Sequence, residues 1–186
     1  KLAITSVSDW VSERAKYAPI LSNKNIVTVE NGLDTEVYKC LDYDDIKEKH
    51  AIKDEKIILH VTPDFFNPIK GGEHVLELAK RLLSENIKII IVGFSGDISN
   101  LSANIIPVKH TKDQKELAKY YSMAELTVLT SKKETFSMVC AESLSCGTPV
   151  VGYKAGAPEN IAIKEFSEFV DQEDIDMLES TVRKWL

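Results

Sequence analysis

The chain has 186 residues, of which 44% are apolar and 28% charged, and 23 Lys+Arg against 29 Asp+Glu give a net charge of −6. These proportions are typical of a globular protein and exclude a disordered tail, a collagen-like fibre and a membrane-embedded chain. The acidic balance, without a basic stripe, argues against a nucleic-acid partner.

The first 45 residues predict a small α/β unit followed by a linker. We expect a strand at Leu2–Val7, a helix at Trp10–Leu21 that is capped by Asp9, and a second strand at Ile26–Val29. A turn is expected at Asn31-Gly32, and a charged surface helix or linker at Asp42–Asp54. The change in composition places a domain boundary between residues 35 and 55. Residues 1–45 are therefore interpreted as the end of one domain with its linker, and 56–186 as a second domain.

The second domain alternates short β-branched runs with helical stretches. Strands are predicted at Ile57–Thr62, Lys88–Phe94, Ile105–Lys109, Leu126–Thr130 and Pro149–Tyr153, and helices at Glu73–Glu85, Lys112–Ala124 and Ser137–Cys146. The strands show little polar alternation, which indicates burial on both faces. Repeated strand–helix–strand units predict a Rossmann-like, doubly wound parallel sheet of the α/β class.

Three cysteines, Cys40, Cys140 and Cys146, lack metal-ligand spacing and are too few for a disulfide framework. A reducing compartment such as the cytoplasm is the simple interpretation. No apolar run approaches about 18 residues, and we expect no signal peptide. The chain opens at Lys1, already inside an apolar run, and we expect it to be a piece of a longer protein.

The loop Pro63–Gly72 is the first candidate binding segment, because ligands of open α/β sheets bind at the carboxyl ends of the strands. Lys70 precedes Gly71 and Gly72 at a predicted helix start. Glycines allow close approach of the backbone, and free amides at a helix start attract anions. The segment is a candidate phosphate site, and the alternative is a lysine on a flexible turn.

The segment Ser131–Glu142 is the second candidate, with Glu134 in a loop and Glu142 in the second turn of a helix. Both carboxylates are placed to accept hydroxyl hydrogen bonds from a ligand over the helix start, and the amides of residues 136–138 suit a phosphate or an oxyanion. The alternatives are a helix-dipole partner with a solvated glutamate, an acid–base pair, or a metal site. No nearby histidine completes a metal site, so no metal is predicted. Among the histidines, His60 is expected in the core, and His110 on the ligand side, within reach of a nucleobase.

With these residues in view, the chain resembles the family 4 glycosyltransferases, which have the GT-B fold. Short motifs in register carry the resemblance: Asn31-Gly32-Leu33-Asp34 with Tyr38, Lys70-Gly71, Ser131 with the Glu134…Glu142 spacing, Ser145–Val151, and Ala155–Glu159. The resemblance implies that residues 56–186 are the C-terminal, donor-binding half of such an enzyme. The acceptor-binding half would precede this chain and is missing from it.

The resemblance also implies roles for individual residues. Lys70 and Gly71 would contact the donor diphosphate, Glu142 the ribose hydroxyls, and Glu134 the donor sugar, with Glu134 and Lys70 as the catalytic pair. The stretch through Thr135, Phe136, Ser137 and Met138 would contact the sugar or phosphate. The implied activity is retaining transfer from a nucleotide sugar to a glycan or lipid-linked glycan, in polysaccharide biosynthesis, with no separate cofactor.

Two departures from the family pattern bear on this expectation. The family's Arg before the Lys-Gly has no counterpart in Asp64–Ile69, and its paired glycines are reduced to Gly156-Ala157. We expect the piece to bind nucleotide or sugar nucleotide without transferring sugar alone. The expected location is the cytoplasm, with peripheral association of the full-length protein at the inner membrane face left open. A sugar-nucleotide epimerase and a non-catalytic sugar-nucleotide-binding module are the alternatives.

Overall fold

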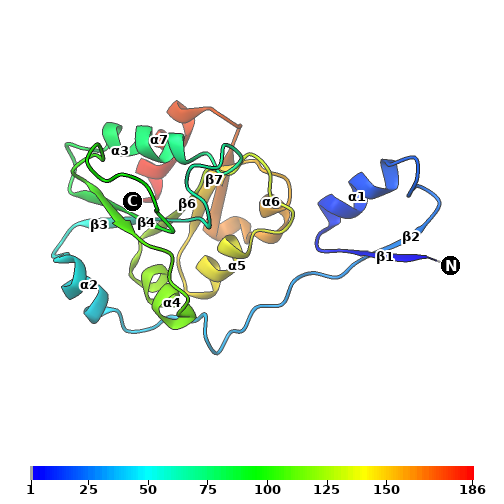
Figure 1. Ribbon diagram of the computed structural model, residues 1–186, viewed down its shortest axis with the longest axis horizontal. Coiled ribbons are helices and arrows are strands. Elements are labelled where there is room, and N and C mark those ends of the chain that lie inside the picture. Colours follow the sequence, from blue (N-terminus) through cyan, green and yellow to red (C-terminus); the bar gives the residue numbers. More distant parts are fainter. Residues whose placement is uncertain (1) are drawn as a thin grey trace.

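The computed structural model describes residues 2–186 and contains two parallel sheets. The smaller is formed by β1 (Ala3–Ser6) and β2 (Asn25–Thr28), which are joined through α1 (Asp9–Tyr17). An extended stretch connects this unit to the larger sheet, and the unit lies at one end of the molecule (Figure 1). The position of α1 brings its first turn against the loops of the larger sheet.

The boundaries of α1 differ from the prediction at both ends. The cap is Ser8 instead of Asp9, because the Ser8 hydroxyl accepts the Val11 amide at 3.3 Å. The helix stops at Tyr17, four residues before Leu21, because the residue that precedes Pro19 is disfavoured in helical conformation. Ala18 accordingly has an extended ψ of 124°.

The larger sheet has six parallel strands. They are β3 (Lys56–Val61), β4 (Ile87–Val92), β5 (Ile105–Val108), β6 (Leu126–Leu129), β7 (Val150–Tyr153) and β8 (Ser167–Val170). Their order is β5-β4-β3-β6-β7-β8. Counted from β3 this is 3-2-1-4-5-6, the Rossmann order, so the predicted doubly wound fold is confirmed.

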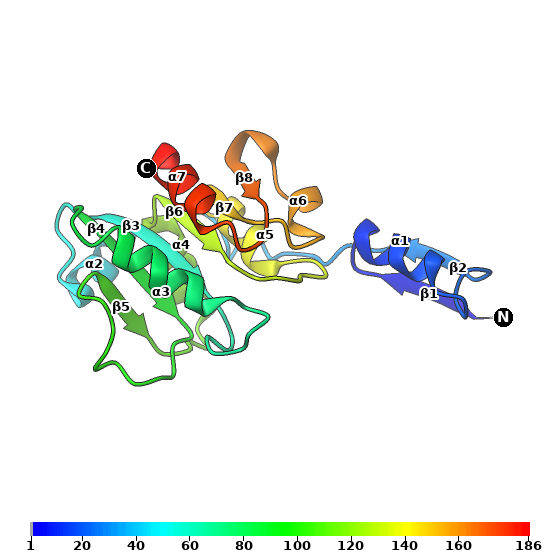
Figure 2. The ribbon, with the colours of Figure 1, turned by 90° about the horizontal axis from the view of Figure 1, so that it is seen from above.

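Helices cover both faces of this sheet (Figures 1 and 2). One face is packed by α3 (Gly72–Arg81) and α7 (Ile175–Trp185), through Leu78 and Leu178 among others. The other face is packed by α2 (Asp44–His50), α4 (Gln114–Met123) and α5 (Met138–Ser145). The short α6 (Pro158–Ile161) and the 3-10 turn η1 (Lys164–Phe166) lead into β8. The sheet thereby lies between two layers of helices. Its inner strands β3, β4, β6 and β7 are largely buried, whereas the edge strands β5 and β8 are mostly half-buried.

The linker between the two sheets follows the prediction only in part. Asn31-Gly32 is extended, and the turn begins instead at Asp34, whose carboxylate accepts the Glu36 amide at 2.9 Å. The charged segment contains the helix α2, and Tyr38 and Ile46 are buried against the large sheet. Residues well before Lys56 thus contribute to the core of the large sheet.

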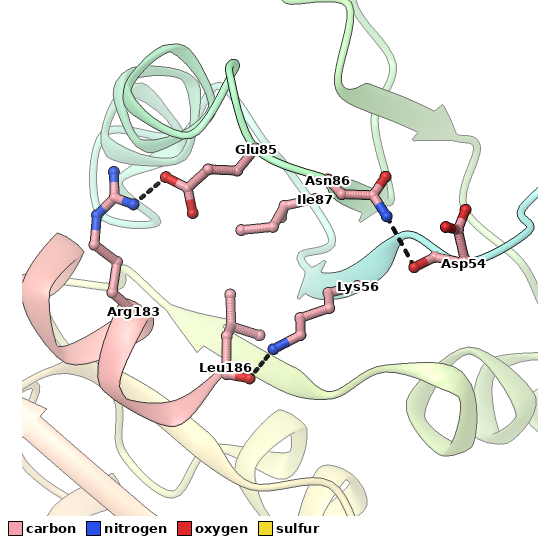
Figure 3. A pocket seen from close by; sticks show the side chains of 7 residues that line it. All are labelled: Asp54, Lys56, Glu85, Asn86, Ile87, Arg183 and Leu186. Atoms are coloured by element: carbon pink, nitrogen blue, oxygen red, sulfur yellow. Dashed lines mark hydrogen bonds and ion pairs between the residues drawn. The ribbon is translucent and has the colours of Figure 1, made fainter.

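A pocket of about 420 Å³ lies at the amino ends of β3 and β4 (Figure 3), lined by Asp54, Lys56, Glu85, Asn86, Ile87, Arg183 and Leu186. Its polar groups bind one another: Arg183 pairs with Glu85, Lys56 donates to the Leu186 carbonyl, and the Asn86 amide donates to the Asp54 carbonyl at 3.0 Å. The pocket lies at the sheet edge opposite to the one where doubly wound domains bind ligands.

Candidate functional site

The candidate site lies at the carboxyl edge of the sheet, between β3 and β6. The chain winds from β3 toward β5 on one side and from β6 toward β8 on the other, which makes this the topological switch point. Backbone pairing of β3 with β6 ends at Leu59 and Thr127. Beyond that point the buried His60 ring bonds the Val128 carbonyl through Nδ1 at 3.0 Å. A side chain thus replaces the backbone ladder where the two strands separate.

Lys70 and Glu134 meet in this crevice. Lys70 Nζ is 2.8 Å from Glu134 Oε1, and the two side chains retain 25% and 16% of their exposure. Their loops are bound to each other, because the Thr130 hydroxyl donates to the Lys70 carbonyl at 2.9 Å and the Lys132 amide donates to the Ile69 carbonyl at 2.7 Å. Two residues from distant parts of the sequence are therefore held as one partly shielded ion pair.

Gly71 allows the two loops to approach this closely. It has φ +65°, and a Cβ there would lie 2.3 Å from the Thr130 carbonyl oxygen. Glycine is therefore required beside Lys70, as predicted, but the group that approaches it closely is the protein backbone at Thr130 and not a ligand. Gly71 also immediately precedes α3, so Lys70 lies directly before the start of a helix.

The residues after Glu134 present backbone amides at the start of α5. Ser137 has a left-handed backbone (φ 77°) and caps the helix by accepting the Cys140 amide at 3.4 Å. In the described part of the chain, the amides of Phe136, Ser137 and Met138 donate to no protein group. Phe136 is buried, whereas Thr135 is exposed and its carbonyl accepts the Ser8 hydroxyl at 2.6 Å. The arrangement provides a positive helix end beside the Lys70–Glu134 pair.

Glu142 lies on the same helix but has other partners. Its carboxylate accepts the Tyr121 hydroxyl at 2.9 Å, and Tyr121 is fully buried on α4. Burial raises the pKa of Glu142, and the hydrogen bonds from Tyr121 and Tyr38 oppose that rise. Among residues 2–186, it makes no hydrogen bond or ion pair with Lys70 or Glu134. The structure brings together Lys70, Gly71 and the 134–138 stretch, and places Glu142 on the α4 side.

A cavity of about 560 Å³ adjoins the site at the carboxyl ends of β4 and β5. It is lined by Pro63, the loop Gly93–Gly96, Ile98, Pro107, Lys109 and His110. His110 therefore lies on the ligand edge, as predicted. Gly93 and Gly96 were not predicted from the sequence, although two glycines three residues apart directly after a buried strand are a signal for close backbone approach. The close neighbours are protein atoms, since a Cβ at Gly93 would lie 1.7 Å from the Thr62 carbonyl oxygen and one at Gly96 2.4 Å from the Phe66 ring.

Residues 2–186 contain no group of three His, Cys, Asp or Glu side chains arranged to hold a metal ion. None of the described helices combines the length and the apolar character needed to cross a bilayer.

The fold and the site together define a doubly wound α/β domain whose switch-point crevice holds the Lys70–Glu134 pair beside the start of α5. Residues 42–186 match the family model described as glycosyl transferases group 1, and the chain belongs to this family. It is 30% identical over 149 residues to N-acetyl-alpha-D-glucosaminyl L-malate synthase from Bacillus anthracis, covering 75% of this chain and 38% of that protein. It is 25% identical over 152 residues to D-inositol 3-phosphate glycosyltransferase 1 from Catenulispora acidiphila, covering 72% and 36%.

Solved structures show the same fold at low identity. Sucrose-phosphate synthase from Thermosynechococcus elongatus superposes with a TM-score of 0.84 at 22% identity, over 98% of this chain and 48% of that chain. The Anabaena protein HepE in complex with UDP gives a TM-score of 0.78 at 18% identity, over 97% and 52%. The chain thus spans about half the length of these solved proteins and less than half that of its curated relatives. The expected GT-B architecture is confirmed for the part that this chain represents.

Proposed function

We propose that this chain is the donor-binding half of a retaining glycosyltransferase, which moves a sugar from a nucleotide sugar to a glycan or lipid-linked glycan. The observation that carries the proposal is the Lys70–Glu134 pair, 2.8 Å apart beside the amides of residues 136–138 at the switch point. A cation, a carboxylate and unpaired amides at one place match a phosphate next to a polyhydroxylated sugar.

Each group has a task in this proposal. Lys70 and the helix-start amides stabilise the negative charge that develops on the diphosphate as its bond to the sugar carbon breaks. Glu134 accepts sugar hydroxyls, and Glu142 the ribose hydroxyls. The cavity at Gly93–Gly96 and His110 receives the nucleobase. The acceptor hydroxyl bonds to the sugar carbon, and its proton passes to the released diphosphate, which balances the transfer.

The comparisons support a nucleotide sugar as donor, since HepE has been solved with UDP and with UDP-glucose. Since the chain spans 38% of the Bacillus anthracis protein's length, transfer is proposed to need an acceptor half in addition. We further propose that the whole protein acts in the cytoplasm in polysaccharide biosynthesis, in peripheral contact with the inner membrane face.

A calorimetric titration with UDP, GDP and their sugar conjugates tests donor binding. We expect saturable binding by at least one of these ligands, and at least a tenfold loss of affinity in Lys70→Ala, because charge-assisted bonds to a phosphate are lost. Lys53→Ala is the matched control, since Lys53 is exposed near the opposite edge of the sheet. The proposal is contradicted if the folded chain binds none of these ligands, or if Lys70→Ala and Lys53→Ala bind the ligand with equal affinity.

One observation favours a second candidate, a sugar-nucleotide-binding module without catalysis. The loop Asp64–Ile69 carries no cation beside Lys70, and Phe65 is buried while Phe66 is exposed. Asn67 faces its own loop, where it accepts the Ile69 amide at 3.0 Å. Asn67→Arg places a cation in this loop. If it raises neither phosphate affinity in this chain nor turnover in the full-length protein, the absence of the Arg is not simply the loss of one phosphate contact.

A further inference from the structure

A third hollow, of about 390 Å³, lies between α1 and the loops that follow β6 and β7. Segments far apart in the sequence form it. Trp10 and Arg14 come from α1, whereas Lys132, Lys133, Lys154 and Gly156 come from the loops of the large sheet. The hollow is distinct from the Lys70–Glu134 crevice and from the cavity at Gly93–Gly96, with which it shares no lining residue.

The charge around this hollow is only partly neutralised. Lys132 pairs with Glu173 at 2.8 Å, and Lys154 pairs with Asp171 at 2.6 Å. Across residues 2–186, neither Arg14 nor Lys133 pairs with a carboxylate. The Arg14 guanidinium instead lies 4.0 Å from the centre of the Trp10 ring. Stacking on the indole orients this cation without neutralising it.

The Glu159 carboxylate, which lines the hollow, is already hydrogen-bonded within the protein. Glu159 accepts the Gly156 amide at 2.9 Å through Oε2 and at 3.2 Å through Oε1. The Trp10 indole nitrogen donates to no protein group among the described residues. Arg14, Lys133 and the indole N–H therefore remain as donors for a ligand, and all three favour a negatively charged one.

The hollow is coupled to the candidate site through backbone contacts. The Glu134 amide donates to the Ala155 carbonyl at 2.9 Å, and Glu134 forms an isolated parallel bridge with Gly156. Gly156 in turn lies against the Trp10 ring, since a Cβ on Gly156 would be 2.4 Å from it. A ligand in the hollow thus lies beside the segment that carries Glu134.

We propose that this hollow binds a carboxylate or phosphate group carried by the acceptor, so that the acceptor substrate is anionic. The inference rests on the proposed function, because an acceptor is meaningful only if sugar transfer occurs. Two cations from opposite sides of the hollow recognise the anion, and they do so only while α1 lies on the Gly156 loop.

NMR titration of the ¹⁵N-labelled chain with inorganic phosphate, glucose 6-phosphate and glucose tests the proposal. We expect both phosphates to shift the Trp10 indole and Gly156 amide signals, glucose 6-phosphate at least threefold more tightly, and glucose to shift neither. Equal affinity of the two phosphates shows a free-anion site and overturns the acceptor assignment. Shifts confined to residues 136–138, and abolished by Lys70→Ala, show binding at the donor crevice and overturn it as well.

Paired variants give an independent test. Arg14→Ala/Lys133→Ala should weaken phosphate binding at least tenfold, whereas Lys16→Ala/Lys164→Ala, which removes the same charge from exposed positions, should change it less than twofold. Equal losses indicate non-specific attraction and contradict the proposal. A UDP titration separates the two ideas: UDP binding without phosphate binding in the hollow overturns this inference alone, whereas no binding of any nucleotide or nucleotide sugar overturns the proposed function.

Discussion

His60 shows how one side chain prepares the crevice. It is fully buried in β3, its Nδ1 bonds the Val128 carbonyl, and its Nε2 has no partner within the described chain. Burial lowers the pKa of His60 to about 4, from an ordinary value of 6.5. The ring is therefore neutral in the folded protein at pH 7, and its Nδ1 carries the hydrogen that the Val128 carbonyl accepts.

His60 should make the fold sensitive to acid. Between pH 6.5 and about 4 the unfolded chain binds a proton at His60 and the folded chain does not, so stability falls as the pH falls. The full effect is on the order of 3 kcal/mol. In urea denaturation, His60→Asn should lose this part of the pH dependence while still offering a donor to Val128.

His110→Asn is the control for this experiment, because His110 is exposed at the end of β5. It should keep the pH profile of the unmodified chain. If the unmodified chain and His60→Asn have parallel profiles between pH 6.5 and 4, the assignment of acid sensitivity to His60 is wrong.

Sequence patterns predicted the residues of the candidate site, and the structure shows how they are arranged. Lys70 and Glu134 were both predicted at strand ends, and the parallel sheet brings such ends to one edge. The orientation of Glu142 could not be predicted, because it depends on Tyr121 from a different helix. The roles of these residues stay predictions until donor binding is measured.

At the scale of elements, the loops after β3 and β6 are built as one unit. The contacts that join them run through the carbonyls of Ile69 and Lys70, with Thr130 and Lys132 as donors. Gly71 lies at the closest approach. The positions of Lys70 and Glu134 therefore depend on backbone packing as well as on their own ion pair.

Two glycine substitutions separate backbone strain from steric overlap. Gly71 and Gly147 both have positive φ, but a Cβ at Gly147 meets nothing within 4 Å. Gly147→Ala should cost about 1 kcal/mol from backbone strain alone. Gly71→Ala should cost at least about 2 kcal/mol more, because its Cβ overlaps the Thr130 carbonyl. Urea denaturation measures both, and equal costs would show that the loops can move apart freely.

The sheet elements were the most predictable part of the fold, because the β-branched runs of β3, β4 and β6 are buried on both faces. The strand β8 and the long helix α7 were not singled out in the sequence, although α7 has a regular apolar stripe. The prediction of a turn at Asn31-Gly32 was wrong, because the chain is extended there as the linker between the two sheets, and this overrides the local preference of Asn-Gly for a turn. The division into 1–45 and 56–186 stays a prediction.

At the scale of the whole molecule, the small β1–α1–β2 unit contacts the loops of the large sheet through few residues. The Ser8 hydroxyl donates to the Thr135 carbonyl at 2.6 Å, and the Trp10 ring covers Gly156. An extended linker joins the two parts (Figure 1). Such a contact holds the unit in place without adding to the core of the large sheet.

Trp10→Ala should release the small unit and leave the large sheet intact. We expect a larger radius of gyration in X-ray scattering and at least threefold faster proteolysis in the linker at residues 29–34. The urea midpoint of the large sheet, followed by the fluorescence of Trp185 on α7, should not change, because Trp185 is then the remaining tryptophan. Tyr17→Ala, at an 88% exposed aromatic on the same helix, is the control. Unchanged scattering in Trp10→Ala contradicts this account.

The contact of Trp10 with Gly156 also constrains how relatives of this chain can diverge. Any side chain at position 156 would overlap the indole and would also be strained by the φ of +115°, so a larger residue there requires both a smaller one at position 10 and a different loop conformation. A larger side chain at position 156 alone would shift the loop that is bridged to Glu134. In an alignment of relatives, we therefore expect positions 10 and 156 to covary. A chimera that combines the small β1–α1–β2 unit of one relative with the large sheet of another should be most stable when the residues at positions 10 and 156 come from the same parent.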